Sequence, residues 1–224
     1  MVRQESPVIK MDSYDEFLGL IGRKRVSREQ FIEFGLEHVY MVDDDLALSE
    51  LENAIKALKD RKDTQLLTIR RYGKNEDNQD NPYLKLYEKI FDVSLTQDRD
   101  NNQRPIEIMK HLFGCSFKSQ HYQCAHVWGM TKNPIMFTAL FNIVLIPRMF
   151  DPLTGHESRG RLLNEFQRRF KEHVKAHFKR SIVRYNRFLR GRGMEEQINR
   201  YYKECKARRP EVFLKNAIKE WKAI

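Results

Sequence analysis

The sequence predicts an α+β protein that is mainly helical, with one hairpin of strands embedded among the helices. Three observations support this fold class. Helix caps and apolar residues at helical spacing recur along most of the 224 residues. Two apolar runs, residues 122–129 and 141–150, flank the turn-forming segment Lys132-Asn133-Pro134, which favours two strands joined by a loop. Apolar residues over 159–190 follow one another at gaps of three or four, which predicts one long amphipathic helix.

The N-terminal region, residues 1–62, predicts short helices. Ser27 with Gln30, and Ser49 with Glu52, have the spacing of a capping box, in which side chains and backbone amides bond reciprocally at a helix start. The helices expected here are 13–22, 27–40 and 49–60.

The central region, residues 63–190, combines strands and helices. A β-rich segment closed by Gly73 predicts a first strand. Pro105 and Gly114 mark the start and the end of one helix, because a missing amide is tolerated in the first turn and glycine favours the helix end. The expected elements are a strand at 64–73, helices at 83–92 and 104–114, the hairpin, and the helix at 159–190.

The C-terminal region, residues 191–224, predicts a basic helical extension. Gly191 and Gly193 break the long helix, and two further helices are expected at 194–210 and 211–224. No Pro-, Gly- or Ser-rich linker divides the chain, so the three regions are expected to form one compact unit.

The composition argues against membrane spans and disulfide frameworks. The mean hydropathy is −0.68 and 32% of residues are charged. No apolar run reaches the ~18 residues that a membrane span requires. Cys115, Cys124 and Cys205 form no pairing pattern, which is typical of a reduced, intracellular protein. We therefore expect a cytoplasmic protein that does not insert into membranes.

The positive charge is concentrated at the C-terminal end. The formal net charge is +10, but residues 157–224 hold 20 Lys and Arg against 8 Asp and Glu, whereas residues 1–156 hold 21 against 23. Such asymmetry favours a polyanionic partner, and we expect DNA, with RNA not excluded. The alternatives are a solvated helical face without a ligand and a docking surface for an acidic protein. A homodimer is also an option.

Polar residues around the hairpin have the order that phosphodiester hydrolysis requires. The reaction needs a base for water, a divalent cation and a rigid scaffold for both. His126 ends the first expected strand, Asn142 opens the second, and Asp151 and His156 precede the long helix. The alternative is structural: a hydrogen-bonded histidine, an asparagine that satisfies a strand end, and an ordinary turn at 151–156.

This segment resembles the HNH, or ββα-metal, endonucleases over about 35 residues. The matching parts are "AHVWG", "FNIVLIP" and "DPLTGHE". The resemblance implies a ββα-metal core and a metal-dependent DNA endonuclease of bacterial or phage origin, with a restriction or defence role. It implies that His126 is the general base and that Asn142 orients the loop or binds the metal. Asp151 and His156 would be further ligands of Mg²⁺ or Mn²⁺.

The chain departs from the family pattern at two positions. Many members have an aspartate directly before the first histidine, and this chain has Ala125. This departure supports an alternative, a nucleic-acid-binding protein that has lost catalysis. Many members also carry CxxC pairs; this chain has none and has Pro147 at one such position, so no structural zinc is expected. The spacing of Cys115, His121, Cys124 and His126 suits no common zinc module.

Several basic residues are candidates for contacts with phosphate, because arginine and lysine supply most backbone contacts to nucleic acids. Around the hairpin they are Arg70, Arg71, Lys132 and Arg148, and before and along the long helix they are Arg159, Arg161 and Arg168. Each of them could instead be an exposed charge without a ligand.

Overall fold

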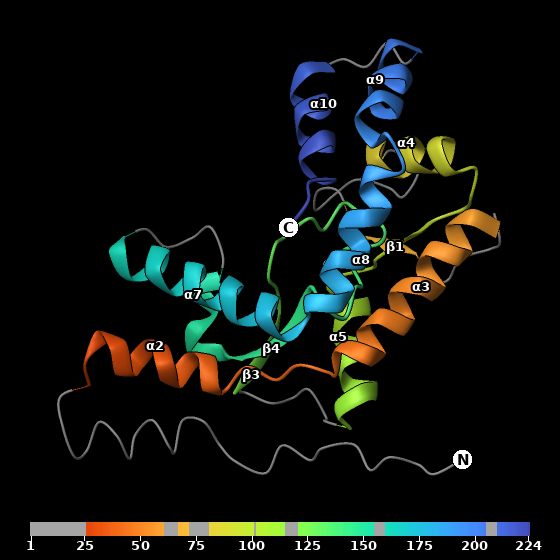
Figure 1. The fold of residues 1–224 in the computed structure, drawn as a ribbon. Helices are drawn as coiled ribbons and strands as arrows, with labels where there is room; N and C mark the ends of the chain where they lie inside the picture. The colour runs from red at the N-terminus through yellow and green to blue at the C-terminus, as the bar shows by residue number, and fades with distance from the viewer. Residues whose placement is uncertain are drawn as a thin grey trace, which may run out of the picture.

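The computed structural model describes residues 26–60, 67–71, 81–100, 102–114, 121–154, 160–204 and 210–224, and they form a mainly helical α+β fold (Figure 1). The predicted fold class is thereby confirmed. The α-helices are α2 (Arg28–Glu37), α3 (Asp44–Asp60), α4 (Pro82–Phe91), α5 (Gln103–Phe113), α6 (Asp151–Thr154), α7 (Arg161–His177), α8 (Lys179–Arg190), α9 (Met194–Glu204) and α10 (Pro210–Lys219). A short 3-10 helix, η2, spans Arg148–Phe150.

The predicted hairpin is confirmed as an antiparallel pair, β3 (Tyr122–His126) and β4 (Ile143–Pro147). Tyr122 lies opposite Pro147 and His126 lies opposite Ile143. All five residues of β4 are buried. Tyr40 covers the other edge of β4, since its amide and carbonyl both bond Leu145. The hairpin is therefore the centre of the core rather than a surface ribbon.

The predicted capping box is present at α2 but not at α3. The Ser27 hydroxyl accepts the amide of Gln30, and the Gln30 side chain accepts the amide of Ser27. Helix α3 instead begins at Asp44, so Ser49 lies inside the helix, and the predicted start was wrong. Asp44 and Asp45 give the first turn the negative charge that a helix N-terminus favours. The helix predicted at 13–22 lies outside the described residues.

The first predicted strand is much shorter than expected. Only Thr68–Ile69 forms a strand, β1, within the described part of 64–73, and it pairs in parallel with β2 (Thr96–Gln97). Strand β2 was not predicted, because a two-residue strand has too few side chains to show an alternation. Leu67 and Ile69 are fully buried, so burial rather than strand length anchors this segment.

The helix predicted at 159–190 is interrupted at Phe178, where α7 ends and α8 begins. Phe178 is buried, and the apolar stripe continues across the break. The carboxylate of Asp44 accepts the amides of Arg180 at 2.8 Å and Ser181 at 3.1 Å, so α3 supplies an acceptor for the start of α8. Because this acceptor is remote in sequence, the periodicity alone could not predict the break.

The C-terminal helices join the same core. Trp221, just after α10, packs edge-on against Tyr87 of α4, with ring centroids 5.6 Å apart. One cluster of buried residues extends from Ile32 to Trp221. This cluster includes residues from all three of the regions named from the sequence. No helix within those ranges is long and apolar enough to cross a membrane.

Candidate functional site around His126

His126 is half-buried at the end of β3, and its ring is held by Phe137. The ring bonds the carbonyl oxygen of Phe137 through Nε2 at 2.9 Å and stacks on the Phe137 ring, with centroids 5.4 Å apart. A carbonyl can only accept, so Nε2 carries the proton and Nδ1 is the basic nitrogen of the neutral ring. Burial and the nearby charge of Arg70 lower the pKa of His126 to about 4, although the bond to Phe137 opposes this shift. The ring is therefore a neutral base at physiological pH.

Asn142 is fully buried, and backbone groups occupy its amide. Its Oδ1 accepts the amide of Trp128 at 3.0 Å, while Nδ2 donates to the carbonyls of Gly129 at 3.0 Å and Met136 at 2.8 Å. These bonds tie both arms of the hairpin loop to the start of β4. Of the two roles considered from the sequence, this geometry favours loop orientation over metal ligation.

Asp151 does not lie beside His126. It is the first residue of α6, and its carboxylate accepts a hydrogen bond from Gln123 Nε2. Gln123 is three residues before His126 on β3, so the two side chains leave opposite faces of the strand, about 10 Å apart along it. The described geometry therefore places the Asp151 carboxylate apart from the His126 ring. His156, the other ligand candidate, lies outside the described residues, as does Arg159.

Arg70 is the predicted phosphate contact that the fold brings close to His126. Its amide donates to the carbonyl of Thr131 at 2.9 Å, which ties the segment after β1 to the hairpin loop. The guanidinium has no hydrogen-bond or ion-pair partner among the described residues, and its charge contributes to the low pKa of His126. Lys132 Nζ donates to the carbonyls of Arg70 and Arg71. Lys132 therefore holds this backbone in place.

The remaining basic candidates have other surroundings. Arg71 donates weakly to the carbonyl of Arg99 at 3.5 Å. Arg148 is exposed, and its amide donates to the carbonyl of His121. Arg161 and Arg168 are exposed on α7, where Arg168 pairs with Glu172 at 2.9 Å.

Sequence reasoning missed that several basic side chains are neutralised within the fold. Ion pairs join α7 and α8 to the acidic α2 and α3: Arg169 with Glu29 and Glu33, Arg180 with Asp45, and Arg184 with Glu52. Part of the remaining charge forms a basic face on α7, on the side away from its buried stripe. This face consists of Arg161, Arg168, Lys171 and Lys175.

Sequence reasoning also missed the polar network that fixes the hairpin loop. Asn133 accepts the amides of Ile135 and Met136 through Oδ1, and Nδ2 donates to the Tyr185 hydroxyl and the Glu220 carbonyl. The Glu220 carboxylate accepts the amide of Lys132 at 2.9 Å. The Asn-Pro dipeptide indicated a turn, but no local pattern indicated that the C-terminal segment would secure it.

The described residues contain no group of three or more His, Cys, Asp or Glu side chains placed to hold a metal ion. Cys124, one member of the zinc alternative, is buried, and burial raises the pKa of its thiol to about 12. Zinc binds the thiolate, so this environment disfavours Cys124 as a ligand. Cys115 lies outside the described residues.

The fold and this site define a mainly helical α+β protein built around a buried hairpin that presents a neutral histidine. Residues 45–223 match the family described as "Uncharacterised protein PM1201", and the chain belongs to this family. The chain is similar to the uncharacterized protein PM1201 of Pasteurella multocida (strain Pm70), with 28% identity over 182 residues, covering 80% of each chain. No solved structure matches the chain.

Proposed function

We propose that the chain is an endonuclease that hydrolyses phosphodiester bonds of DNA through an HNH-like site, consistent with a restriction or defence role. The observation that carries this proposal is the state of His126. Its Nε2 donates a hydrogen bond to the carbonyl of Phe137, its Nδ1 is the basic nitrogen, and its ring is neutral at physiological pH. A general base for water must be unprotonated and must present a nitrogen that can accept a proton, and such a base contributes about 10²- to 10⁴-fold in rate.

Arg70 supplies the second chemical element of the proposal. Its guanidinium is unpaired among the described residues and is close enough to lower the pKa of His126. A guanidinium binds phosphate through paired N–H donors and stabilises negative charge on the transferring group. In the proposed reaction Arg70 holds the scissile phosphate while Nδ1 of His126 takes a proton from the attacking water. The water oxygen bonds phosphorus as the bond from phosphorus to the leaving sugar oxygen breaks, and the leaving oxygen takes a proton from solvent.

The arrangement of the hairpin supports an HNH-like core. Two antiparallel strands, a long loop and a following helix occur in the ββα order, with His126 ending the first strand and Asn142 clamping the loop. The basic face of α7 supplies Arg161, Lys171 and Lys175 for contacts with the DNA backbone, and Arg168 after exchange of its exposed pair with Glu172.

Binding of a divalent ion, Mg²⁺ or Mn²⁺, is predicted only by the resemblance to the HNH endonucleases. The described residues do not fit the expected ligand set, because backbone groups occupy the Asn142 amide and Asp151 faces Gln123. Asp151 and His156 are the residues whose substitution should lower metal affinity if the ion binds here.

A DNA-binding protein without catalysis is the second candidate. Two observations favour it: Ala125 replaces the usual aspartate, and Asp151 is separated from His126. This candidate retains the basic face of α7 and predicts salt-dependent DNA binding without cleavage.

The two candidates differ in one assay. Purified full-length protein is incubated with supercoiled plasmid and either Mg²⁺ or Mn²⁺, beside His126→Ala and the matched control His173→Ala, which removes an exposed histidine of α7. The endonuclease proposal predicts nicking by the wild type and the control, and its loss in His126→Ala. Plasmid binding without nicking under either ion would support the second candidate, and nicking by a correctly folded His126→Ala would reject His126 as the base.

A further inference from the structure

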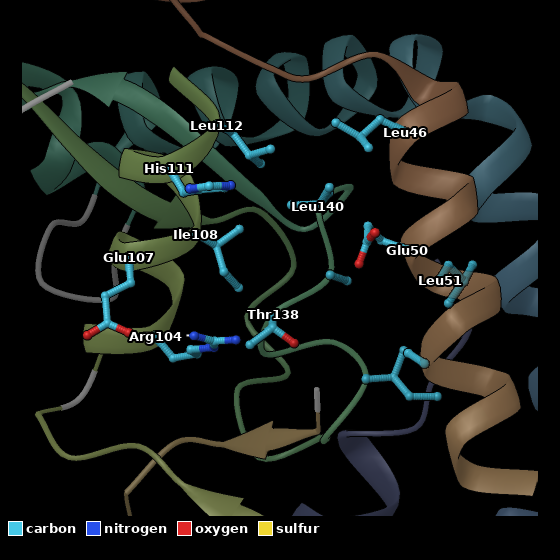
Figure 2. Close-up of a pocket in the computed structure, with 13 residues that line it drawn as sticks. Leu46, Glu50, Leu51, Arg104, Glu107, Ile108, His111, Leu112, Thr138 and Leu140 are labelled. Carbon is cyan, nitrogen blue, oxygen red and sulfur yellow. Dashed lines mark ion pairs between the residues drawn. The ribbon is translucent and has the colours of Figure 1, made fainter. Parts of the chain in front are cut away.

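A separate cleft of about 520 Å³ lies between α3, α5 and the loop segment 135–140 (Figure 2). Its volume is within the range of small-molecule sites, about 300–1,000 Å³. None of the residues assigned to the candidate nuclease site lines it. We therefore consider a separate ligand for this cleft.

The cleft has a partly exposed apolar surface. Leu51 and Leu140 are buried, whereas Ile108 and Leu112 are half-buried and Leu46 is 39% exposed. A large exposed apolar side chain at the rim of an apolar hollow gains free energy when a ligand covers it. The ligand should therefore carry an apolar group.

Opposite charges enter the cleft from its two walls. Glu50 projects from α3 and Arg104 from α5, on either side of Thr138 (Figure 2). Glu50 has no ion-pair or hydrogen-bond partner among the described residues. Arg104 pairs with Glu107 at 3.7 Å, with both side chains over 40% exposed. An exposed pair at that distance is weak, so the guanidinium can exchange Glu107 for a ligand carboxylate.

We propose that this cleft binds a small zwitterion with an apolar side group, of the chemical class of an aliphatic or aromatic α-amino acid. Arg104 receives the carboxylate through two N–H donors, and Glu50 pairs with the ammonium group. The apolar side group packs on Ile108 and Leu112, and the Thr138 hydroxyl bonds a polar atom of the ligand.

The position of the cleft links it to the hairpin loop. Thr138, which lines the cleft, directly follows Phe137, whose carbonyl accepts the hydrogen bond of His126. A ligand on Thr138 therefore contacts the residue next to that carbonyl. Resonances of Phe137 are expected to respond to ligand together with those of the cleft itself.

The proposal is tested by titrating the full-length, isotope-labelled protein with L-phenylalanine and following amide resonances. Saturable shifts are expected in 46–54, 104–112 and 135–140. Phenethylamine lacks the carboxylate and 3-phenylpropionate lacks the ammonium group, so each should bind about fivefold or more weakly, the loss that one exposed ion pair produces. Glu50→Gln and Arg104→Gln should each weaken the binding of phenylalanine to a similar extent. Lys110→Gln, an exposed substitution on α5 outside the cleft, should not.

Two outcomes would overturn the proposal. One is the absence of saturable shifts with both phenylalanine and leucine up to their solubility limits. The other is equal affinity for phenylalanine and the two single-charge analogues, which would show that the opposed charges do not select the ligand. The measurement needs no catalysis, so it is independent of the endonuclease proposal.

Discussion

Asp44 of α3 caps α8 by accepting the backbone amide of Ser181 at 3.1 Å, and it also accepts a hydrogen bond from the Ser181 hydroxyl. The first residue of α3 thereby supplies the acceptor for the start of α8, although Asp44 and Ser181 are 137 positions apart in the chain. The same carboxylate accepts the amide of Arg180, the residue that pairs with Asp45. This contact fixes where the long basic helix breaks.

Asp44→Ala is expected to lower the free energy of unfolding by about 1–2 kcal/mol, the usual cost of losing an N-cap acceptor. Asp44→Asn retains one acceptor oxygen and should recover much of the loss. Urea unfolding followed by circular dichroism measures both. Asp45→Ala removes an exposed ion pair instead, and its effect should stay within about 0.5 kcal/mol. Equal effects of Asp44→Ala and Asp45→Ala would contradict the capping role.

The elements that sequence pattern predicted correctly are those that depend on neighbouring residues. Ser27 and Gln30 cap one helix, and the apolar runs around Asn133-Pro134 form the hairpin. The break at Phe178 depends on Asp44, a tertiary contact that periodicity does not contain.

For the candidate site, too, the sequence predicted local positions but not tertiary contacts. His126 ends its strand as expected. Its proximity to Arg70, however, results from the bond between the Arg70 amide and Thr131, two segments far apart in sequence. The separation of Asp151 follows from its bond to Gln123, because Gln123 and His126 are three residues apart on β3 and leave opposite faces of the strand.

The neutral state of His126 should make stability depend on pH. Burial is the main cause that lowers its pKa to about 4, from 6.5 in the unfolded chain. Between these values the unfolded chain binds more protons, so this contribution is complete above about pH 6.5 and is lost as pH falls towards 4. It amounts to roughly 3 kcal/mol, at about 1.36 kcal/mol for each pKa unit. In His126→Gln, which keeps an N–H donor but does not titrate, the decline in unfolding free energy over this window should be smaller. An identical decline in both proteins would contradict the low pKa.

Arg70→Gln should affect both the ring and the proposed reaction. Removal of the nearby positive charge should raise the pKa of His126, measured from its imidazole carbon resonances. Plasmid cleavage should fall on the order of tenfold or more, because a phosphate donor is lost. Arg71→Gln is the matched control, since the Arg71 side chain bonds the Arg99 carbonyl, and the pKa of His126 should not change in it. A raised pKa with unchanged cleavage would confirm that the charge of Arg70 acts on His126 and would reject a role of Arg70 in cleavage.

The basic face of α7 should control the salt dependence of DNA binding. Lys171 and Lys175 are exposed and have no ion pair among the described residues. If both contact phosphate, Lys171→Gln with Lys175→Gln should reduce the slope of log K against log salt by about 2. Arg184→Gln removes a cation that pairs with Glu52, and it should leave the slope unchanged. Fluorescence anisotropy with a duplex of fixed sequence measures both slopes, and an unchanged slope in the double variant would exclude this face as the DNA contact.

Asn142→Ala should be among the most destabilising single substitutions in the chain. It removes the partners of the Trp128 amide and of the Gly129 and Met136 carbonyls, the last of these in the buried loop. Each buried group left without a partner costs about 1–3 kcal/mol, so a loss of roughly 3 kcal/mol or more is expected.

Asn142→Asp separates the two roles considered for this residue. The carboxylate keeps an acceptor for Trp128 and would be a stronger ligand for a divalent ion, but it loses both donor bonds and places a charge in a fully buried position. If Asn142 acts as a loop clamp, the Asn142→Asp variant should unfold at a lower urea concentration than the wild type, with or without Mg²⁺. The shift in the urea midpoint should be about the same as in Asn142→Ala. As a metal ligand, it should retain stability and gain Mg²⁺ affinity, measured by isothermal titration calorimetry. The three backbone bonds lead us to expect the first result.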